Sequence, residues 1–340
     1  MTDTPAVSVI VPCYNLGAYV TEAVDSVLAQ TYPDFEIVVV NDGSTDAGTN
    51  AVLAALDRPR TTVLTTENRG LPAARNHAVQ HARGRYVCAL DADDRLRPQF
   101  LEKTIGVLER DPSVAFVSTW IECFGAERWI WRQERCDFPK LLAECVVLTA
   151  APVRREALDA VGGYDGERFA EGDEDWDFWI SLVERGFRGT IVPEVLFDYR
   201  QREGSMRRVA MQSEVRQRVW RNLLDKHRPS YERFLPDVLL LMEDECGRLL
   251  LENWRLEREI ESDLATLAAR RAERDRLRAA APAIAAEPDA DLRRDLAYAR
   301  AEVAALRASW SWSLTAPLRV GYDAWLTMRR GLGSMTGRRS

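Results

Sequence analysis

Three carboxylates follow a short apolar run in the N-terminal half of the chain. Val87–Leu90 has the composition of a buried strand, and Asp91, Asp93 and Asp94 come directly after it. Ligands of open α/β sheets bind outside the carboxyl ends of the strands. Carboxylates two residues apart, as Asp91 and Asp93 are, suit Mg²⁺ or Mn²⁺ bridging to phosphate oxygens. The alternative is an acidic loop in which Asp94 caps the next helix.

A second acidic group lies at the predicted start of a later helix. Residues 171–177 contain five acids in seven positions. Acids at a helix start commonly cap it and favour the helix dipole, which is the alternative to a functional role. Five acids exceed what a cap requires. We therefore predict that Asp175 is a general base, which must lie within hydrogen-bond reach of the proton that it removes, and that Asp173 is the cap.

Three further loops follow predicted strands, and in an open α/β sheet such loops line one crevice. Asp42 can accept a hydrogen bond from a base N–H or a ribose hydroxyl. The turn 70–75 offers helix N-terminal amides and the guanidinium of Arg75, which both suit phosphate. A divalent ion on Asp91 and Asp93 would offset the repulsion between a diphosphate and these acids, and would stabilise a departing diphosphate. The three loops are Pro12–Asn15, Asn41–Asp46 and Asn68–Asn76.

Other nucleotide sites are disfavoured by what the sequence lacks. It contains no G-x-x-x-x-G-K-[ST] and no G-x-G-x-x-G, which disfavours a P-loop NTPase and a Rossmann dehydrogenase. A metal-dependent nucleotidyltransferase is the second hypothesis. It requires a Gly-rich segment with Lys or Arg directly after the first strand, and Pro12–Asn15, which stands there, lacks that signature. A non-catalytic scaffold with the same fold is the third hypothesis, and both acidic groups argue against it.

Alternating strand and helix patterns must position these loops. They predict an α/β fold with a mainly parallel sheet flanked by helices. Residues 120–148 are expected to form an antiparallel excursion and a helix that shape a substrate pocket. Strands are predicted at 7–11, 36–40, 61–64, 86–90, 114–119, 188–192 and 195–199. Helices are predicted at 18–29, 49–56, 71–82 and 155–160, with another that begins at 98 and one that opens within 171–177 and ends near 185.

The composition excludes several classes of protein. The 340 residues carry a net charge of −7, which argues against a nucleic-acid partner. The sequence contains no stretch typical of a membrane span and no N-terminal signal pattern, so we expect a cytoplasmic protein. The six cysteines contain no C-x-x-C and are typical of free thiols.

The C-terminal third has a different character. We expect a catalytic domain over 1–215, a helical extension over 216–281, a heptad-like helix over 282–310 and a basic amphipathic tail over 311–340. The apolar positions Leu292, Leu296, Ala299, Val303, Leu306 and Trp310 suit either a homo-oligomeric coiled coil or an intramolecular helix. The tail, rich in Trp and Arg, suits either contact with the inner face of the cell membrane or packing on the protein itself.

Taken together, the motifs resemble those of the family 2 glycosyltransferases, in the family's order and at similar intervals, over about Ala6 to Arg207. Asn41 departs from the family, because many members have Asp there. This departure leaves open which nucleobase the donor carries. The ending Ser311–Arg319 is similar to that of some bacterial surface-polysaccharide glycosyltransferases. The motifs are Val9–Asn15, Val40–Asp46, Asn68–Gly70, Ala74–Asn76, Asp91–Asp93 and Glu174–Asp177.

The resemblance implies a GT-A fold and an inverting transfer of a sugar from a UDP-, GDP- or dTDP-sugar to a glycan or lipid-linked acceptor. It implies that Asp93 binds Mg²⁺ or Mn²⁺, with Asp91 near the ribose and the metal, and that Asp175 is the base. The nucleotide-sugar contacts that we expect are Pro12, Tyr14, Asn15, Asp42, Arg75, Asp91 and Arg200, the last at the diphosphate.

Overall fold

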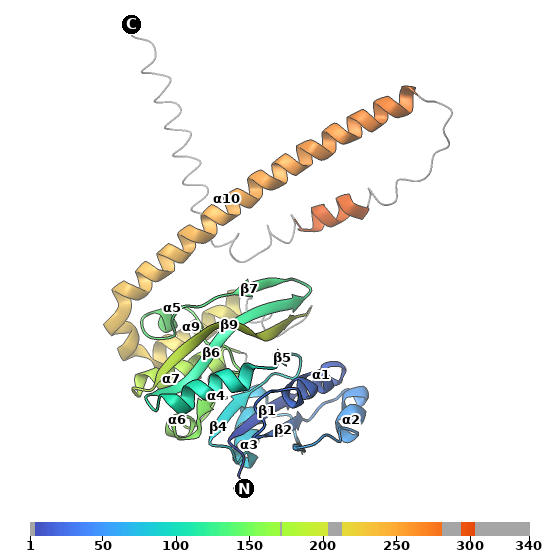
Figure 1. Cartoon of the computed structure of the whole chain (residues 1–340). Coiled ribbons are helices and arrows are strands. Elements are labelled where there is room, and N and C mark those ends of the chain that lie inside the picture. Colours follow the sequence, from blue (N-terminus) through green and yellow to red (C-terminus); the bar gives the residue numbers. More distant parts are fainter. Residues whose placement is uncertain (1–3, 171, 203–212, 281–293, 303–340) are drawn as a thin grey trace. The chain divides into compact units, whose positions relative to one another are not determined.

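The fold was analysed in a computed structural model, which describes residues 4–170, 172–202, 213–280 and 294–302 (Figure 1). The chain divides into two units, Met1–Leu239 and Leu240–Ser340. Each unit is described by itself. The predicted domain boundaries stay predictions.

The first half of the first unit is a parallel sheet, as expected. Its strands stand in the order β3-β2-β1-β4, and each neighbouring pair is parallel. Every residue of β1 and β2 is buried, which explains why their sequences are almost continuously apolar. The bounds are β1 Val7–Cys13, β2 Phe35–Asp42, β3 Thr61–Thr66 and β4 Tyr86–Ala89.

The second half of the sheet is mixed and continues the order as β8-β6-β9-β5. β6 and β9 are parallel, while β5, β7 and β8 run antiparallel to their partners. The pairing of β7 with β6 confirms the predicted antiparallel excursion. The bounds are β5 Arg95–Leu96, β6 Val114–Gly125, β7 Trp129–Trp131, β8 Val153–Arg154 and β9 Arg188–Gln201.

The prediction of two closing strands was wrong, because β9 is continuous. Val192 pairs with Thr119 and Val195 pairs with Trp120, so two residues of β9 are left over between them. One of these is Pro193, which has no N–H to donate to a ladder. A bulge absorbs both residues, and the strand resumes beyond them.

Helices connect and cover these strands. From β1 the chain adds β2 and then β3 on one side of β1, and it then crosses back to add β4 on the other side. Because crossovers are right-handed, this reversal places α3 on the face of the sheet opposite to α1 and α2. Gly70, with φ of 84°, precedes α3 and lets the chain turn sharply into the helix. The bounds are α1 Gly17–Leu28, α2 Ala47–Ala54, α3 Leu71–His81, α4 Phe100–Arg110, α5 Lys140–Ala143, α6 Arg155–Val161 and α7 Glu174–Glu184.

Helix α7 lies in the core rather than on the surface. Trp176, Phe178 and Trp179 are all fully buried, and Phe116 of β6 packs against Trp179 with ring centroids 5.0 Å apart. A helix that is apolar around most of its circumference must be surrounded by protein. The core therefore fixes the position of the helix start, where the second acidic group stands.

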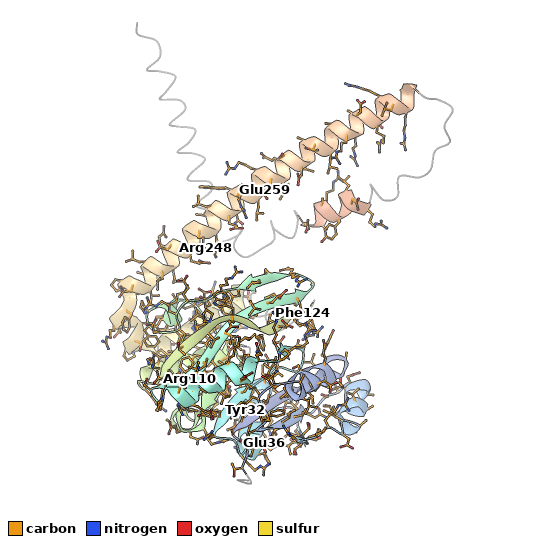
Figure 2. The ribbon with its side chains drawn as sticks, viewed as in Figure 1. Tyr32, Glu36, Arg110, Phe124, Arg248 and Glu259 are labelled. Carbon is orange, nitrogen blue, oxygen red and sulfur yellow. The ribbon has the colours of Figure 1, made fainter. Side chains whose placement is uncertain are left out.

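Two C-terminal helices follow, α9 Ser213–Lys226 and α10 Arg228–Ala280. Val219 and Leu223 of α9 are buried in the first unit, and the hydroxyl of Tyr231 donates to the carbonyl of Leu142. Within the second unit, α10 carries charged side chains such as Arg248 and Glu259 along its length (Figure 2).

Part of the predicted heptad and the tail lie outside the described residues. These are Leu292, Val303, Leu306, Trp310 and 311–340; the described residues 294–302 are helical. Within the described ranges, no helix is both long and apolar enough to cross a membrane.

Candidate active site

The first two loops are fastened to each other through Asn15. This residue has φ of 55°, and its side-chain oxygen accepts hydrogen bonds from the amides of Thr45 and Asp46, both at 2.9 Å. The loop after β1 is thus held against the loop after β2. Pro12 lies buried in β1, whereas Tyr14 is exposed. The roles predicted for these three residues at the nucleotide sugar stay predictions.

Asp42 is buried at the end of β2 and organises the turn before α3. Its two carboxylate oxygens accept hydrogen bonds from the amides of Arg69 (3.0 Å) and Gly70 (3.1 Å). The Gly70 amide, predicted above to serve phosphate, donates to Asp42 instead. Because a buried carboxylate needs such donors, Asp42 and the turn fix each other in place.

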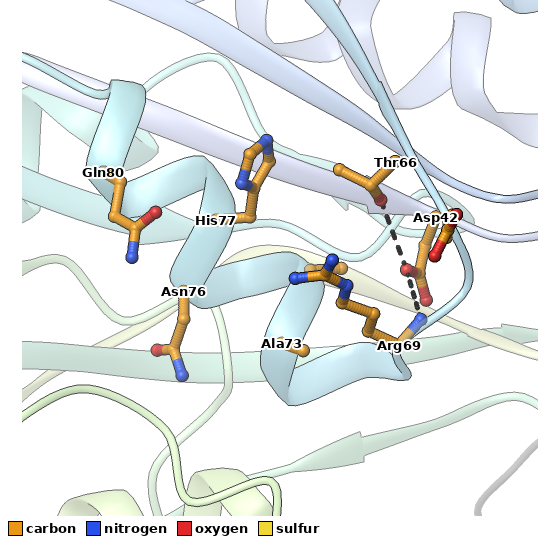
Figure 3. Close-up of a pocket in the computed structure, with 9 residues that line it drawn as sticks. Asp42, Thr66, Arg69, Ala73, Asn76, His77 and Gln80 are labelled. Carbon is orange, nitrogen blue, oxygen red and sulfur yellow. Dashed lines mark hydrogen bonds between the residues drawn. The ribbon is translucent and has the colours of Figure 1, made fainter.

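A cavity of about 350 Å³ opens beside Asp42 (Figure 3). Its volume is in the range of small-molecule sites. Its walls come from the ends of β2 and β3, the following turn and one face of α3. Asp91, Asp93 and Asp175 are not among its lining residues, so the cavity does not enclose the acidic groups. The lining residues are Asp42, Thr66, Glu67, Arg69, Ala73, Ala74, Asn76, His77 and Gln80.

The guanidinium of Arg75 joins the two acidic groups. It is 1% exposed, donates to Asp91 at 2.7 Å, and forms an ion pair with Glu174. Cζ of Arg75 also lies over the Tyr164 ring, 5.4 Å from the ring centroid. The fold therefore brings the start of α7 across to the end of β4, as the general-base prediction requires. The predicted contact of Arg75 with the nucleotide stays a prediction.

Glu174 and Asp175 occupy different environments within this cluster. Burial raises the pKa of Glu174 to about 7, against the opposing effect of Arg75. Asp175 is half-buried, and one carboxylate oxygen accepts a hydrogen bond from the hydroxyl of Thr149 at 2.6 Å. Burial also raises the pKa of Asp175 above its ordinary value. Perturbed carboxyls of this kind are typical of acid–base sites.

The prediction that the side chain of Asp173 caps the helix was wrong. Asp173 stands at the N-cap position of α7, but its side chain makes no capping hydrogen bond. Its backbone is left-handed, with φ of 60°, and its carboxylate forms an ion pair with Arg216 of α9 at 2.9 Å. Asp173 therefore ties α7 to α9.

Two arginines from the end of β9 reach the acids after β4. The backbone amide of Arg200 donates to Asp94 at 2.7 Å, and its Nε donates to the carbonyl of Asp93 at 2.7 Å. Arg202 forms an ion pair with the Asp93 carboxylate at 2.6 Å. Asp94 is buried and strongly raised in pKa by burial and by the neighbouring aspartates, which agrees with a structural role.

The acids after β4 fit a divalent cation that shares its ligands with a substrate. In the described part of the chain, no three His, Cys, Asp or Glu side chains gather closely enough to form a metal cage. Mg²⁺ typically binds through one or two carboxylates together with substrate phosphates and water. Asp91 engages Arg75 and Asp93 engages Arg202, each through one carboxylate oxygen, so a divalent ion bound there would share these carboxylates with the two arginines.

Three residues contribute to this site although no role was assigned to them from the sequence. Glu174 belongs to the acidic group but pairs with an arginine 99 residues earlier. Thr149 and Arg202 stand in no chemical pattern, and only the fold brings them to Asp175 and Asp93. The excess of acids at the start of α7 was the one signal that pointed to Glu174.

The family model for glycosyl transferase family 2 matches residues 8–161. Two similar proteins come from Bacillus subtilis (strain 168), and both are named as glycosyltransferases by inference. The glycosyltransferase EpsE is 30% identical over 219 residues, covering 61% of this chain and 77% of EpsE. The teichuronic acid biosynthesis glycosyltransferase TuaG is 32% identical over 204 residues, covering 58% of this chain and 79% of TuaG.

Two solved structures share the fold. S. aureus TarS 1–349 in complex with UDP-GlcNAc matches with a TM-score of 0.54 and 22% identity, covering 64% of this chain and 66% of TarS 1–349. The mannosyltransferase PcManGT from Pyrobaculum calidifontis, in complex with GDP-Man and Mn²⁺, matches with a TM-score of 0.54 and 24% identity, covering 94% of this chain and 85% of PcManGT. The chain therefore belongs to glycosyl transferase family 2 and is a glycosyltransferase with the GT-A fold.

Proposed function

We propose that the protein transfers a sugar, with inversion, from a nucleoside diphosphate sugar to a hydroxyl of a glycan or lipid-linked glycan during the synthesis of a cell-surface polysaccharide. The observation that carries the proposal is the Arg75 bridge between Asp91 and Glu174, which supports a general base at the neighbouring Asp175, close to the acids after β4. The naming of TuaG for teichuronic acid biosynthesis supports the class of acceptor.

In the proposed mechanism the chain's own residues bind, orient and move one proton. The acceptor oxygen attacks the anomeric carbon as the bond to the diphosphate oxygen breaks, and Asp175 takes the hydroxyl proton. Thr149 and the amide of Trp176 hold the Asp175 carboxylate, at 2.6 and 2.8 Å. The cavity beside Asp42 supports placing the nucleoside there.

A divalent ion held by Asp91 and Asp93 would, when bound, supply positive charge for the leaving diphosphate. The Mn²⁺ named in the PcManGT complex supports this part of the proposal. Arg200 lies beside the same acids, which supports a role near the diphosphate.

Association through the C-terminal helices is also proposed. Leucines exposed along α10, among them Leu240, Leu251 and Leu277, would be available to a second helix, as this proposal requires. Membrane contact of the tail stays a prediction.

A donor screen tests the proposal. Purified protein is incubated with UDP-, GDP- and dTDP-sugars, with and without Mn²⁺, together with glycan acceptors, and the anomeric configuration of the product is read by NMR. Transfer from one donor class with inverted configuration is expected. Asp175→Asn should retain nucleotide binding and lose transfer by about 10²–10⁴-fold, which is what a general base contributes.

The matched control is Asp57→Asn, which changes an exposed aspartate outside the site and should leave transfer unchanged. Full transfer by Asp175→Asn would remove this residue from the mechanism. A product that retains the donor's configuration would overturn the inverting mechanism.

A further inference from the structure

The end of β9 delivers two guanidinium groups to the acids after β4, and they are held very differently. Arg200 donates from its backbone amide to Asp94, from Nε to the Asp93 carbonyl, and from one terminal nitrogen to Glu22. Its guanidinium also lies over the rings of Tyr19 and Phe124, at 4.8 and 4.4 Å; Phe124 stands on the projecting end of β6 (Figure 2). Arg200 is therefore a fixed part of the site.

The Arg202 side chain has fewer interactions. In the part of the chain that the structure describes, it makes one ion pair, from Nε to Asp93 at 2.6 Å, and its guanidinium lies 5.4 Å from the Tyr19 ring. Its side chain is 25% exposed. The Asp93 side chain is 14% exposed, so the guanidinium is the more accessible partner of the pair. Arg202 can therefore turn from Asp93 toward solvent when another cation takes its place on the carboxylate.

The acids need a cation in the absence of substrate. Asp91, Asp93 and Asp94 stand within four residues, so their carboxylates lie close together. Arg75 serves Asp91, and Arg202 is the guanidinium that reaches the Asp93 carboxylate. Asp93 is also the residue to which the proposed function gives the divalent ion.

We propose that Arg202 is an exchangeable counter-ion, which neutralises Asp93 in the empty enzyme and gives up this carboxylate when Mg²⁺ or Mn²⁺ binds. The inference rests on the metal assignment in the proposed function and deepens it. The Arg202 guanidinium and the divalent ion compete, because both require the Asp93 carboxylate. By linkage, Arg202 weakens metal binding by the same factor by which the metal weakens the Arg202–Asp93 pair. The empty enzyme should then bind the metal weakly, since the metal must displace Arg202.

The test is direct Mn²⁺ binding, measured by the loss of the free-ion EPR signal in the absence of nucleotide. Arg202→Gln should bind Mn²⁺ about tenfold more tightly than the unaltered protein, which lies within the usual range of coupling between two ligands. Arg202→Lys keeps a positive charge and should bind Mn²⁺ less tightly than Arg202→Gln. Melting curves of both variants confirm that they are folded.

Two controls define the site. Arg58→Gln removes an equal charge from a partly exposed pair with Asp25 and should leave the Mn²⁺ affinity unchanged. Asp93→Asn should abolish the gain that Arg202→Gln produces. Equal or weaker Mn²⁺ binding by Arg202→Gln, or no Mn²⁺ binding by any variant, overturns the proposal. Failure of the proposed function is read separately, as absence of sugar transfer from every donor.

Discussion

At the scale of single residues, Arg75 decides the geometry of the site. It comes from the first turns of α3, yet its partners Asp91 and Glu174 belong to the end of β4 and the start of α7. Its residue type was identifiable from the sequence as suited to an anion. Its partners were not, because the pairing with Glu174 depends on how the whole sheet is covered by α7.

Replacing Arg75 should therefore destabilise the protein strongly. Arg75→Gln leaves the buried Glu174 without its cation, and breaking a buried pair from one side costs about 3–5 kcal/mol. Urea unfolding measures this loss. Arg85→Gln is the control, because its pair with Glu109 is exposed and should cost about 0–1 kcal/mol. Equal losses for the two variants would show that the Arg75 bridge does not support the fold.

The pH dependence of transfer should report Asp175. The base works as a carboxylate, so the rate falls as the pH falls through its pKa, which burial raises above the ordinary value of about 3.9. The hydrogen bond from Thr149 favours the carboxylate and lowers this pKa. Thr149→Val should accordingly move the acid limb of kcat/KM to higher pH. Thr62→Val, at an exposed position of β3, should leave the limb in place, and an unmoved limb in Thr149→Val would contradict the assignment.

At the scale of elements, the sequence predicted those that local patterns define. β1, β2, β4 and α3 appear close to their predicted bounds, since their apolar runs and the Gly70 turn are local signals. β5 and β8 were missed because each has two residues and exists only through its partner strand. The continuous β9 was missed because Pro193 reads as a break, whereas the bulge accommodates it.

The contact between β9 and β6 should be sensitive to one added carbon. A Cβ on Gly189 would lie 2.1 Å from Cε2 and 2.2 Å from Cζ of Phe116, whose ring packs on Trp179 of α7. Overpacking of a core costs about 1–3 kcal/mol, so Gly189→Ala should lower the urea midpoint clearly.

Gly247 provides the matched substitution for that test. A Cβ there meets nothing within 4 Å, and the residue lies inside α10. Alanine is favoured over glycine in a helix by about 0.5–1 kcal/mol, so Gly247→Ala should be neutral or stabilising. If Gly189→Ala were equally well tolerated, the packing of β9 on Phe116 would not be as tight as the structure shows.

At the scale of the molecule, buried charged groups tie α9 and the start of α10 to α7. His227 is 1% exposed, and its two ring nitrogens lie 2.9 Å from Asp177 and 2.8 Å from Glu184 of α7. Lys226 reaches Asp177 and Asp165 as well. The sequence indicated helices here but not what they cover, because a lone histidine among charged residues carries no signal of its partners.

This connection predicts how stability depends on pH. Burial acts to lower the pKa of His227, but the hydrogen bonds to Asp177 and Glu184 outweigh it and raise the pKa above the unfolded value. A group whose pKa is raised by folding stabilises the fold fully below its unfolded pKa, about 6.5 for histidine, and the stabilisation is lost as the pH rises through the folded pKa. The difference in unfolding free energy between the unaltered protein and His227→Gln should therefore be larger near pH 6 than near pH 9.

Urea titrations of both proteins at the two pH values measure that difference, and the exposed His81→Gln should show no such change. A difference that is equal at both pH values would mean that His227 acts only by packing. A larger difference at the lower pH would instead show that the start of α10 is attached to α7 by a protonated histidine. The helix that carries Asp175, the proposed base, would then be held in place by His227, which lies in the same unit, Met1–Leu239.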